Sequence, residues 1–158
     1  MKVRDLMTTT AVSCRAETSL AAVGALMWEH DCGFIPVVDD KEKVTGVITD
    51  RDICIALSTR DRQPSQITAG EVTNVPAFVC SPDDDGQRAL QTMSKERLHQ
   101  LPVTNSDGCL AGILSINDLL LHAEKGTGKT PEISYDEVVQ AFQAICSHPA
   151  ETIHAMAA

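Results

Sequence analysis

The 158-residue sequence predicts a mixed α/β fold made of two tandem strand–helix–strand–strand–helix (βαββα) repeats and a C-terminal helix. Three observations support this prediction: an internal repeat, apolar runs that alternate between strand and helix spacing, and hydrophobic residues that are almost all aliphatic. Hydrophobic residues make up 43% of the chain but aromatic residues only 3%, so the core has to consist mainly of Val, Ile, Leu, Ala and Met. A chain of this length can bury enough surface to fold without a disulfide or a metal.

The internal repeat aligns residues 3–55 with residues 69–121 without a gap. The identical pairs are Ala11/Ala77, Cys14/Cys80, Met27/Met93, Pro36/Pro102, Val37/Val103, Gly46/Gly112 and Asp52/Asp118. Self-similarity at a fixed period is typical of repeated structural units that bury their apolar faces against each other. We therefore predict repeat 1 at residues 1–60 and repeat 2 at residues 61–124, related by a pseudo-twofold axis with clefts between them.

The elements of the first copy follow the order of its apolar runs. A strand over residues 11–14 precedes a helix in which Leu20, Val23, Met27 and His30 recur at helical spacing, with Thr18 as the candidate N-cap. Strands over residues 34–38 and 44–48 flank a polar turn, and a helix over residues 50–57 completes the copy. We interpret residues 58–68, which are polar and contain Pro64, as the linker between the copies.

The second copy has the same order of elements. Acidic residues 83–85 mark the start of its first helix, where the helix dipole favours negative charge, and Asn105–Gly108 is a strong turn signal.

Residues 125–158 are predicted to hold a linker, an amphipathic helix and a disordered tail at 150–158. Ser134 and Glu137 form a capping-box pattern that opens the helix, and Pro149 ends it. One face of this helix carries Val138, Phe142, Ile145 and Cys146. This helix either packs on its own domain or docks on a twin subunit or a partner.

The net charge of −9 disfavours nucleic-acid binding, which depends on Lys and Arg contacts to phosphates, and disfavours docking on an anionic membrane. No charge-free run approaches the roughly 20 residues that span a bilayer. The chain begins with acidic and basic residues before any apolar stretch, which is unlike a secretory signal. The six cysteines are scattered and contain no C-x-x-C pair, so we expect no zinc ribbon and a reducing, cytoplasmic location.

The ends of the two predicted hairpins carry the strongest functional signal. Each strand runs into a hydroxyl residue with an Asp three positions later: Thr49 and Asp52 in the first copy, Ser115 and Asp118 in the second. The free N–H groups of a helix start can meet a phosphate, and an Asp one turn in can accept hydrogen bonds from ribose hydroxyls. The same tetrapeptide is also a helix capping box, which needs no ligand, and one residue can serve both purposes.

At these residues the sequence resembles the tandem CBS (cystathionine-β-synthase) domain family. The resemblance covers residues 3 to about 122 and rests on Val-Arg-Asp-Leu-Met-Thr at 3–8, Ile-Pro-Val-Val-Asp at 35–39, Gly-Val-Ile-Thr-Asp-Arg-Asp-Ile at 46–53 and a degenerate second copy. It implies a regulatory module that binds AMP, ADP or ATP, and sometimes S-adenosylmethionine, with no catalytic cofactor.

The resemblance also implies roles for individual residues. Asp52 and Asp118 would bind ribose hydroxyls, and Thr49 and Ser115 would face phosphate. The walls of one adenine site would be Thr10, Ala11, Val12, Ile35 and Pro36, and those of the other Pro76, Ala77, Phe78, Leu101 and Pro102. Arg51 is either a phosphate ligand or a solvated helix residue, and His99 is a candidate phosphate ligand. Which copy contributes which wall to which site is left open by the sequence.

Two other patterns are weaker. Gly126–Thr130 resembles the end of a phosphate-binding P-loop, but Ala123 replaces the required first Gly, so we interpret it as a flexible linker. His148 and His154 lack the spacing of a helical zinc pair. No nucleophile-and-base set can be assigned, so no catalysis and no metal site are predicted.

The sequence therefore predicts a homodimeric regulatory module that binds adenosine nucleotides and signals to an unidentified partner protein. The alternative is an interaction scaffold that keeps the fold without binding a ligand. Because Arg51 in the first copy corresponds to Asn117 in the second, we expect two unequal sites, of which the Arg51 site favours the more highly phosphorylated ligand.

Overall fold

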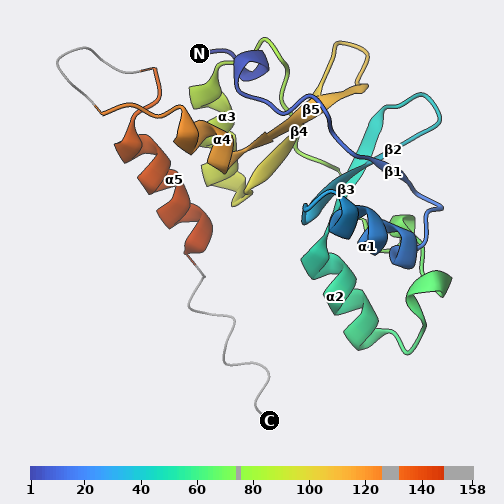
Figure 1. Cartoon of the computed structure of the whole chain (residues 1–158). Helices are drawn as coiled ribbons and strands as arrows, with labels where there is room; N and C mark the ends of the chain where they lie inside the picture. The colour runs from blue at the N-terminus through green and yellow to red at the C-terminus, as the bar shows by residue number, and fades with distance from the viewer. Residues whose placement is uncertain (74–75, 126–131, 148–158) are drawn as a thin grey trace.

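A computed structural model of the chain describes residues 1–73, 76–125 and 132–147. Two α/β units lie side by side, each with a small sheet and two helices, and a further helix flanks the second unit (Figure 1). The predicted fold class, two βαββα repeats followed by a C-terminal helix, is confirmed. Among the described residues, no helix combines the length and the apolar character that crossing a bilayer requires.

Repeat 1 contains a three-stranded sheet in the order β1-β2-β3. Its elements are the 3₁₀ turn η1 (Val3–Asp5), β1 (Cys14–Arg15), α1 (Leu20–Glu29), β2 (Phe34–Val38), β3 (Val44–Thr49) and α2 (Asp50–Thr59). Strand β1 runs parallel to β2, and β2 runs antiparallel to β3. Strand β2 is buried along its whole length, which explains its unbroken apolar sequence.

Repeat 2 repeats this arrangement at the offset of 66 residues. Its elements are η2 (Pro64–Gln66), η3 (Ala69–Glu71), α3 (Gly86–Glu96), β4 (Gln100–Thr104), β5 (Leu110–Ser115) and α4 (Ile116–Leu121). A single parallel bridge between Cys80 and Val103 replaces β1, in the register that joins Cys14 to Val37 in repeat 1. Burial raises the pKa of Cys14 to about 11 and that of Cys80 to about 12, so both thiols pack as apolar groups.

The two repeats exchange their leading segments. Val3 packs in the core of repeat 2, while Ala69 packs in the core of repeat 1. The Val3 N–H donates to the Asp84 carbonyl at 3.0 Å, and the Ala69 N–H donates to the Thr18 carbonyl at 2.8 Å. The two bonds join equivalent residues once the offset of 66 is applied, so each repeat makes the same contact to the other. The repeats are therefore arranged about a pseudo-twofold axis. In Figure 1 the N-terminus accordingly lies beside α3 before the chain crosses to repeat 1.

The hairpin tips join the repeats at a second place. The Val44 N–H donates to the Gly108 carbonyl, and the Leu110 N–H donates to the Glu42 carbonyl, both at 3.0 Å. These bonds are again a symmetric pair. The junction therefore fixes how the two sheets face each other, and with it the shape of the space between them.

The C-terminal helix α5 (Tyr135–Cys146) packs against α3 and α4 (Figure 1). Val138, Ala141 and Ile145 are buried in the core of repeat 2. One face of the helix thus packs on its own domain, as one of the two alternatives from the sequence expected. Cys146, which was assigned to that face, is exposed instead.

Several local predictions are wrong in detail. The N-cap of α1 is Ser19 and not Thr18, because the Thr18 hydroxyl accepts a hydrogen bond from the Arg15 N–H. The first strand begins at Cys14 and not at residue 11. The linker is shorter than residues 58–68, because α2 continues to Thr59 and Ile67 is fully buried. The P-loop-like segment, His148, Pro149, His154 and the tail at 150–158 lie outside the described residues.

Candidate functional site

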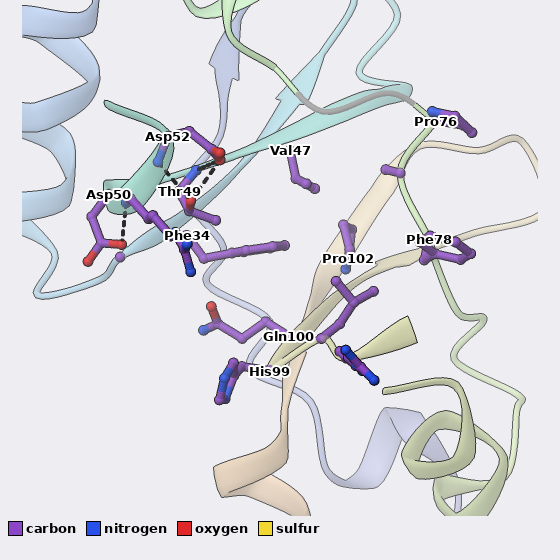
Figure 2. Close-up of a pocket in the computed structure, with 15 residues that line it drawn as sticks. Phe34, Val47, Thr49, Asp50, Asp52, Pro76, Phe78, His99, Gln100 and Pro102 are labelled. Carbon is purple, nitrogen blue, oxygen red and sulfur yellow. Dashed lines mark hydrogen bonds between the residues drawn. The ribbon is translucent and has the colours of Figure 1, made fainter. Parts of the chain in front are cut away.

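Two cavities lie between the repeats, and each begins at the start of a helix. The first cavity has a volume of about 620 Å³ and is lined by Thr49, Arg51 and Asp52 at the junction of β3 and α2. Its opposite wall comes from repeat 2: Pro76, Ala77 and Phe78, together with His99 just before β4 and Pro102 within β4. Figure 2 shows Thr49, Asp50 and Asp52 on one side of this cavity, with His99, Gln100 and Pro102 on the other.

The second cavity has a volume of about 370 Å³ and is the pseudo-symmetric counterpart of the first. Ser115 and Asp118 of repeat 2 line it together with Thr10, Ala11 and Val12 of repeat 1. Each cavity therefore combines the helix start of one repeat with the leading loop of the other. This arrangement answers the question that the sequence left open, namely which copy contributes which wall.

The two helix starts are complete capping boxes. The Thr49 hydroxyl accepts from the Asp52 N–H at 3.2 Å, and the Asp52 carboxylate accepts from the Thr49 N–H at 2.9 Å. In repeat 2 the corresponding distances for Ser115 and Asp118 are 3.1 and 2.7 Å. The capping interpretation of both tetrapeptides is therefore correct, and the same side chains also line the cavities. The two functions are compatible because a carboxylate can accept several hydrogen bonds.

The charges around the two cavities differ. The first cavity is lined by the guanidinium groups of Arg51 and Arg97, and within the described part of the chain neither group forms a hydrogen bond or an ion pair. It also holds two carboxylates, since Asp50 accepts from the Arg51 N–H at 2.7 Å and Asp52 caps α2. Among the described residues that line the second cavity there is no Arg or Lys. The first cavity is thus the one that can neutralise an anion.

Four of the predicted site residues, three of them wall residues, lie in neither lining. Ile35 and Leu101 are fully buried at the centres of the two cores, Pro36 is buried in β2, and Asn117 is exposed on α4. Side chains alternate between the two faces of a strand, so Gln100 and Pro102 face the first cavity while Leu101 faces the helices. The other predicted site residues line one cavity or the other.

The structure also adds lining residues that sequence reasoning missed. In the first cavity they are Gly33, Phe34, Val47, Asp50, Arg97, Leu98 and Gln100, and in the second Thr8, His30, Asp31, Cys32, Phe34, Gln100 and Ile113. Phe34 and Gln100 belong to both cavities and occupy equivalent positions in the repeat. The sequence analysis already named His99 before β4, and the offset of 66 residues would have extended that prediction to the equivalent segment before β2.

No group of three or more His, Cys, Asp or Glu side chains is placed to hold a metal ion within residues 1–73, 76–125 and 132–147.

Comparison with known proteins assigns the family. A family model for the CBS domain matches twice, at residues 3–59 and 69–125. Hypoxic response protein 1 of Mycobacterium tuberculosis is 32% identical over 145 residues, which is 91% of this chain and 93% of that protein. A crystal structure of the hypoxic response protein with two coordinated zinc ions superposes with a TM-score of 0.72 at 27% identity, covering 78% of this chain and all of that one.

Two further solved structures have the same fold. The CBS domain pair of protein MJ0100, in complex with 5′-methylthioadenosine and S-adenosyl-L-methionine, gives a TM-score of 0.69 at 22% identity and covers 75% of this chain and 92% of that one. CBSX2 in complex with AMP gives a TM-score of 0.64 at 23% identity and covers 74% of this chain and 91% of that one. With both repeats matched by the family model and the pair superposing on known CBS pairs, the chain belongs to the CBS domain family as a tandem pair of CBS domains.

Proposed function

We propose that this CBS pair is a regulatory module that binds an adenosine nucleotide, AMP, ADP or ATP, between its repeats and signals the occupancy to a partner protein in the cytoplasm. The observation that supports it most is the first cavity. There, a helix start with an Asp, an apolar loop of the other repeat, and two guanidinium groups that have no partner among the described residues surround one space of about 620 Å³. Cavities of this size hold ligands as large as a nucleotide.

In this proposal the residues of the first cavity have separate tasks. Asp52 accepts hydrogen bonds from the ribose hydroxyls, Thr49 faces a phosphate, and Arg51 and His99 bind phosphate oxygens. Pro102 and the loop 76–78 flank the base. In the second cavity Asp118 and the loop 10–12 have the corresponding tasks toward ribose and base, and Ser115 faces the 5′ substituent of the ligand. None of these tasks is catalytic, so the module would act by binding, with S-adenosylmethionine as a further candidate ligand.

A second candidate function is an interaction scaffold that binds no ligand. It is favoured by the completeness of the capping boxes, since Thr49, Asp52, Ser115 and Asp118 already stabilise helices without any bound molecule. The two candidates differ in a single measurable property. Calorimetric titration of the full chain with AMP, ADP, ATP and S-adenosylmethionine is expected to give saturable binding. If none of the four binds at millimolar concentration, the scaffold is the better description.

We also propose that the protein is a homodimer. Helices α1 and α2 of repeat 1 leave Trp28 at 88% and Ile55 at 49% exposed, and Leu121, the residue of repeat 2 equivalent to Ile55, is 81% exposed. Twofold pairing is the commonest assembly of soluble proteins, and an exposed Trp is typical of an interface.

Sedimentation at micromolar concentration is expected to give twice the 17.0 kDa chain mass. Trp28→Ser should shift the equilibrium toward the monomer while leaving the melting temperature of the monomer unchanged. A single 17.0 kDa species in the unmodified protein contradicts the dimer.

A further inference from the structure

One position in each repeat has the same backbone conformation and the opposite charge. Asp31 follows α1 and Arg97 follows α3, and the two residues are equivalent in the repeat alignment. Their φ angles are +48° and +56°. A left-handed conformation is uncommon for residues other than glycine. Its recurrence at equivalent positions shows that the fold requires this turn in both repeats and holds both residues in the same way.

The two residues line different cavities. Arg97 lines the first cavity and Asp31 lines the second. Both are exposed, and within the described part of the chain neither side chain has a hydrogen bond or an ion pair. Their charges are therefore not neutralised by a neighbouring side chain and act on whatever occupies each cavity.

The other charged residues reinforce the difference. In the first cavity Arg51 and Arg97 balance the carboxylates of Asp50 and Asp52. In the second, Asp31 adds to Asp118, and the described lining residues include no Arg or Lys to balance them. The residue equivalent to Arg51 is Asn117, which lies outside the second cavity. One cavity is thus suited to a phosphate chain, and the other repels it.

We propose that the two cavities sort adenosine ligands by charge: the first takes the phosphorylated nucleotide, and the second takes an adenosine derivative that carries a positive charge on its 5′ substituent, such as a sulfonium group. The inference rests on the proposed function, because it assumes that both cavities bind an adenosine group. It goes further in assigning the selectivity to Asp31 and Arg97, which lie away from the helix starts.

The test compares two ligands that differ by one methyl group and one positive charge. With the first cavity saturated by ATP, the full chain is titrated with S-adenosylmethionine, a sulfonium ion, and with S-adenosylhomocysteine, the uncharged thioether. We expect S-adenosylmethionine to bind about 3–10-fold more tightly at low ionic strength, since one partly screened charge pair gives a factor of this size.

Asp31→Asn is expected to bring the two affinities to within about twofold. Asn adopts the left-handed conformation readily, so this variant should melt like the parent protein. The matched control is Asp61→Asn, which removes one exposed carboxylate from a residue that lines neither cavity. The control should keep the preference for the sulfonium ligand unchanged.

Asp31→Arg provides a second, independent variant, because repeat 2 already holds an Arg in this conformation. We expect its ATP stoichiometry to rise from one to two per chain. Equal binding of the two adenosyl ligands by the parent protein, or an unchanged preference in Asp31→Asn, overturns the charge sorting while leaving the proposed function intact. Failure of AMP, ADP, ATP and S-adenosylmethionine to bind at millimolar concentration overturns the proposed function itself.

Discussion

Gly112→Ala is expected to lower the free energy of unfolding by about 1–3 kcal/mol, the range found when an extra group is forced into a packed site. A Cβ atom on Gly112 would lie 2.6 Å from the Thr8 carbonyl oxygen and 3.2 Å from the Met7 sulfur. The first contact is with backbone, which cannot rotate away as a flexible side chain does. Either β5 or the segment around Thr8 has to move.

That movement is costly because both backbone polar groups of Thr8, the N–H and the carbonyl, are hydrogen-bonded to β5. The Thr8 N–H donates to the Ile113 carbonyl at 2.9 Å, and the Ile113 N–H donates to the Thr8 carbonyl at 3.0 Å. Both residues also line the second cavity. The substitution should therefore weaken binding in the second cavity more than binding in the first.

Gly24→Ala is the matched control, because an added Cβ at this α1 position meets nothing within 4 Å. Ala is the better helix former by about 0.5–1 kcal/mol, so this variant should be as stable as the parent or more stable. Urea unfolding followed by circular dichroism measures both changes. Equal stability of Gly112→Ala and the parent would show that the close approach of the Thr8 segment is not maintained in solution.

The local structure was predictable from the sequence because its causes are local. The apolar run 34–38, the turn Asn105–Gly108 and the capping boxes all depend on residues within a few positions of each other. In the turn, the Asn105 side chain accepts from the backbone of residues 107 and 109, as its residue type predicts. The offset of 66 residues then transferred each of these assignments from one repeat to the other.

The composition of the cavities was not predictable in the same way. Whether Asp52 faces the loop 76–78 or the loop 10–12 depends on how the repeats pack, which no short pattern encodes. The left-handed positions of Asp31 and Arg97 were also missed. Neither residue type is a strong signal for that conformation, and each follows a helix whose end is not marked by glycine. Both positions become evident only when the repeat alignment is combined with the observed backbone.

The predicted boundaries at residues 60 and 124 follow the sequence repeat, whereas each hydrophobic core includes residues from both sides of a boundary. Val3 belongs to repeat 1 by alignment and to the core of repeat 2 by contact. Neither repeat completes its core without a segment from outside its predicted boundaries. We therefore expect an isolated repeat cut at these boundaries to be unstable, and functional tests require the whole chain.

The second large effect is expected from Asp52→Ala, which should weaken ATP binding about 10–100-fold in the first cavity. Asp118→Ala, the equivalent change in the second cavity, should alter ATP affinity by less than about threefold. The reason is that Asp52 lines the cavity that holds Arg51 and Arg97, where a phosphate chain is neutralised. A charge-assisted hydrogen bond to a ribose hydroxyl contributes about 1.5–3 kcal/mol, which corresponds to the expected loss.

Asp52 also caps α2, so loss of stability has to be separated from loss of binding. The capping box of α5 provides the control: Glu137 accepts from the Ser134 N–H at 2.9 Å at the start of the helix, and it lines neither cavity. Glu137→Ala should cost stability to a similar degree, about 1 kcal/mol for a lost cap, and leave ATP affinity unchanged. Calorimetry gives the affinities of the three variants, and thermal melting gives their stabilities.

If Asp52→Ala and Glu137→Ala both lower the melting temperature and both leave ATP binding intact, then Asp52 is only a helix cap and the ribose contact does not exist. If Asp118→Ala abolishes tight ATP binding instead, then the phosphate chain occupies the second cavity, against the distribution of charge between the two.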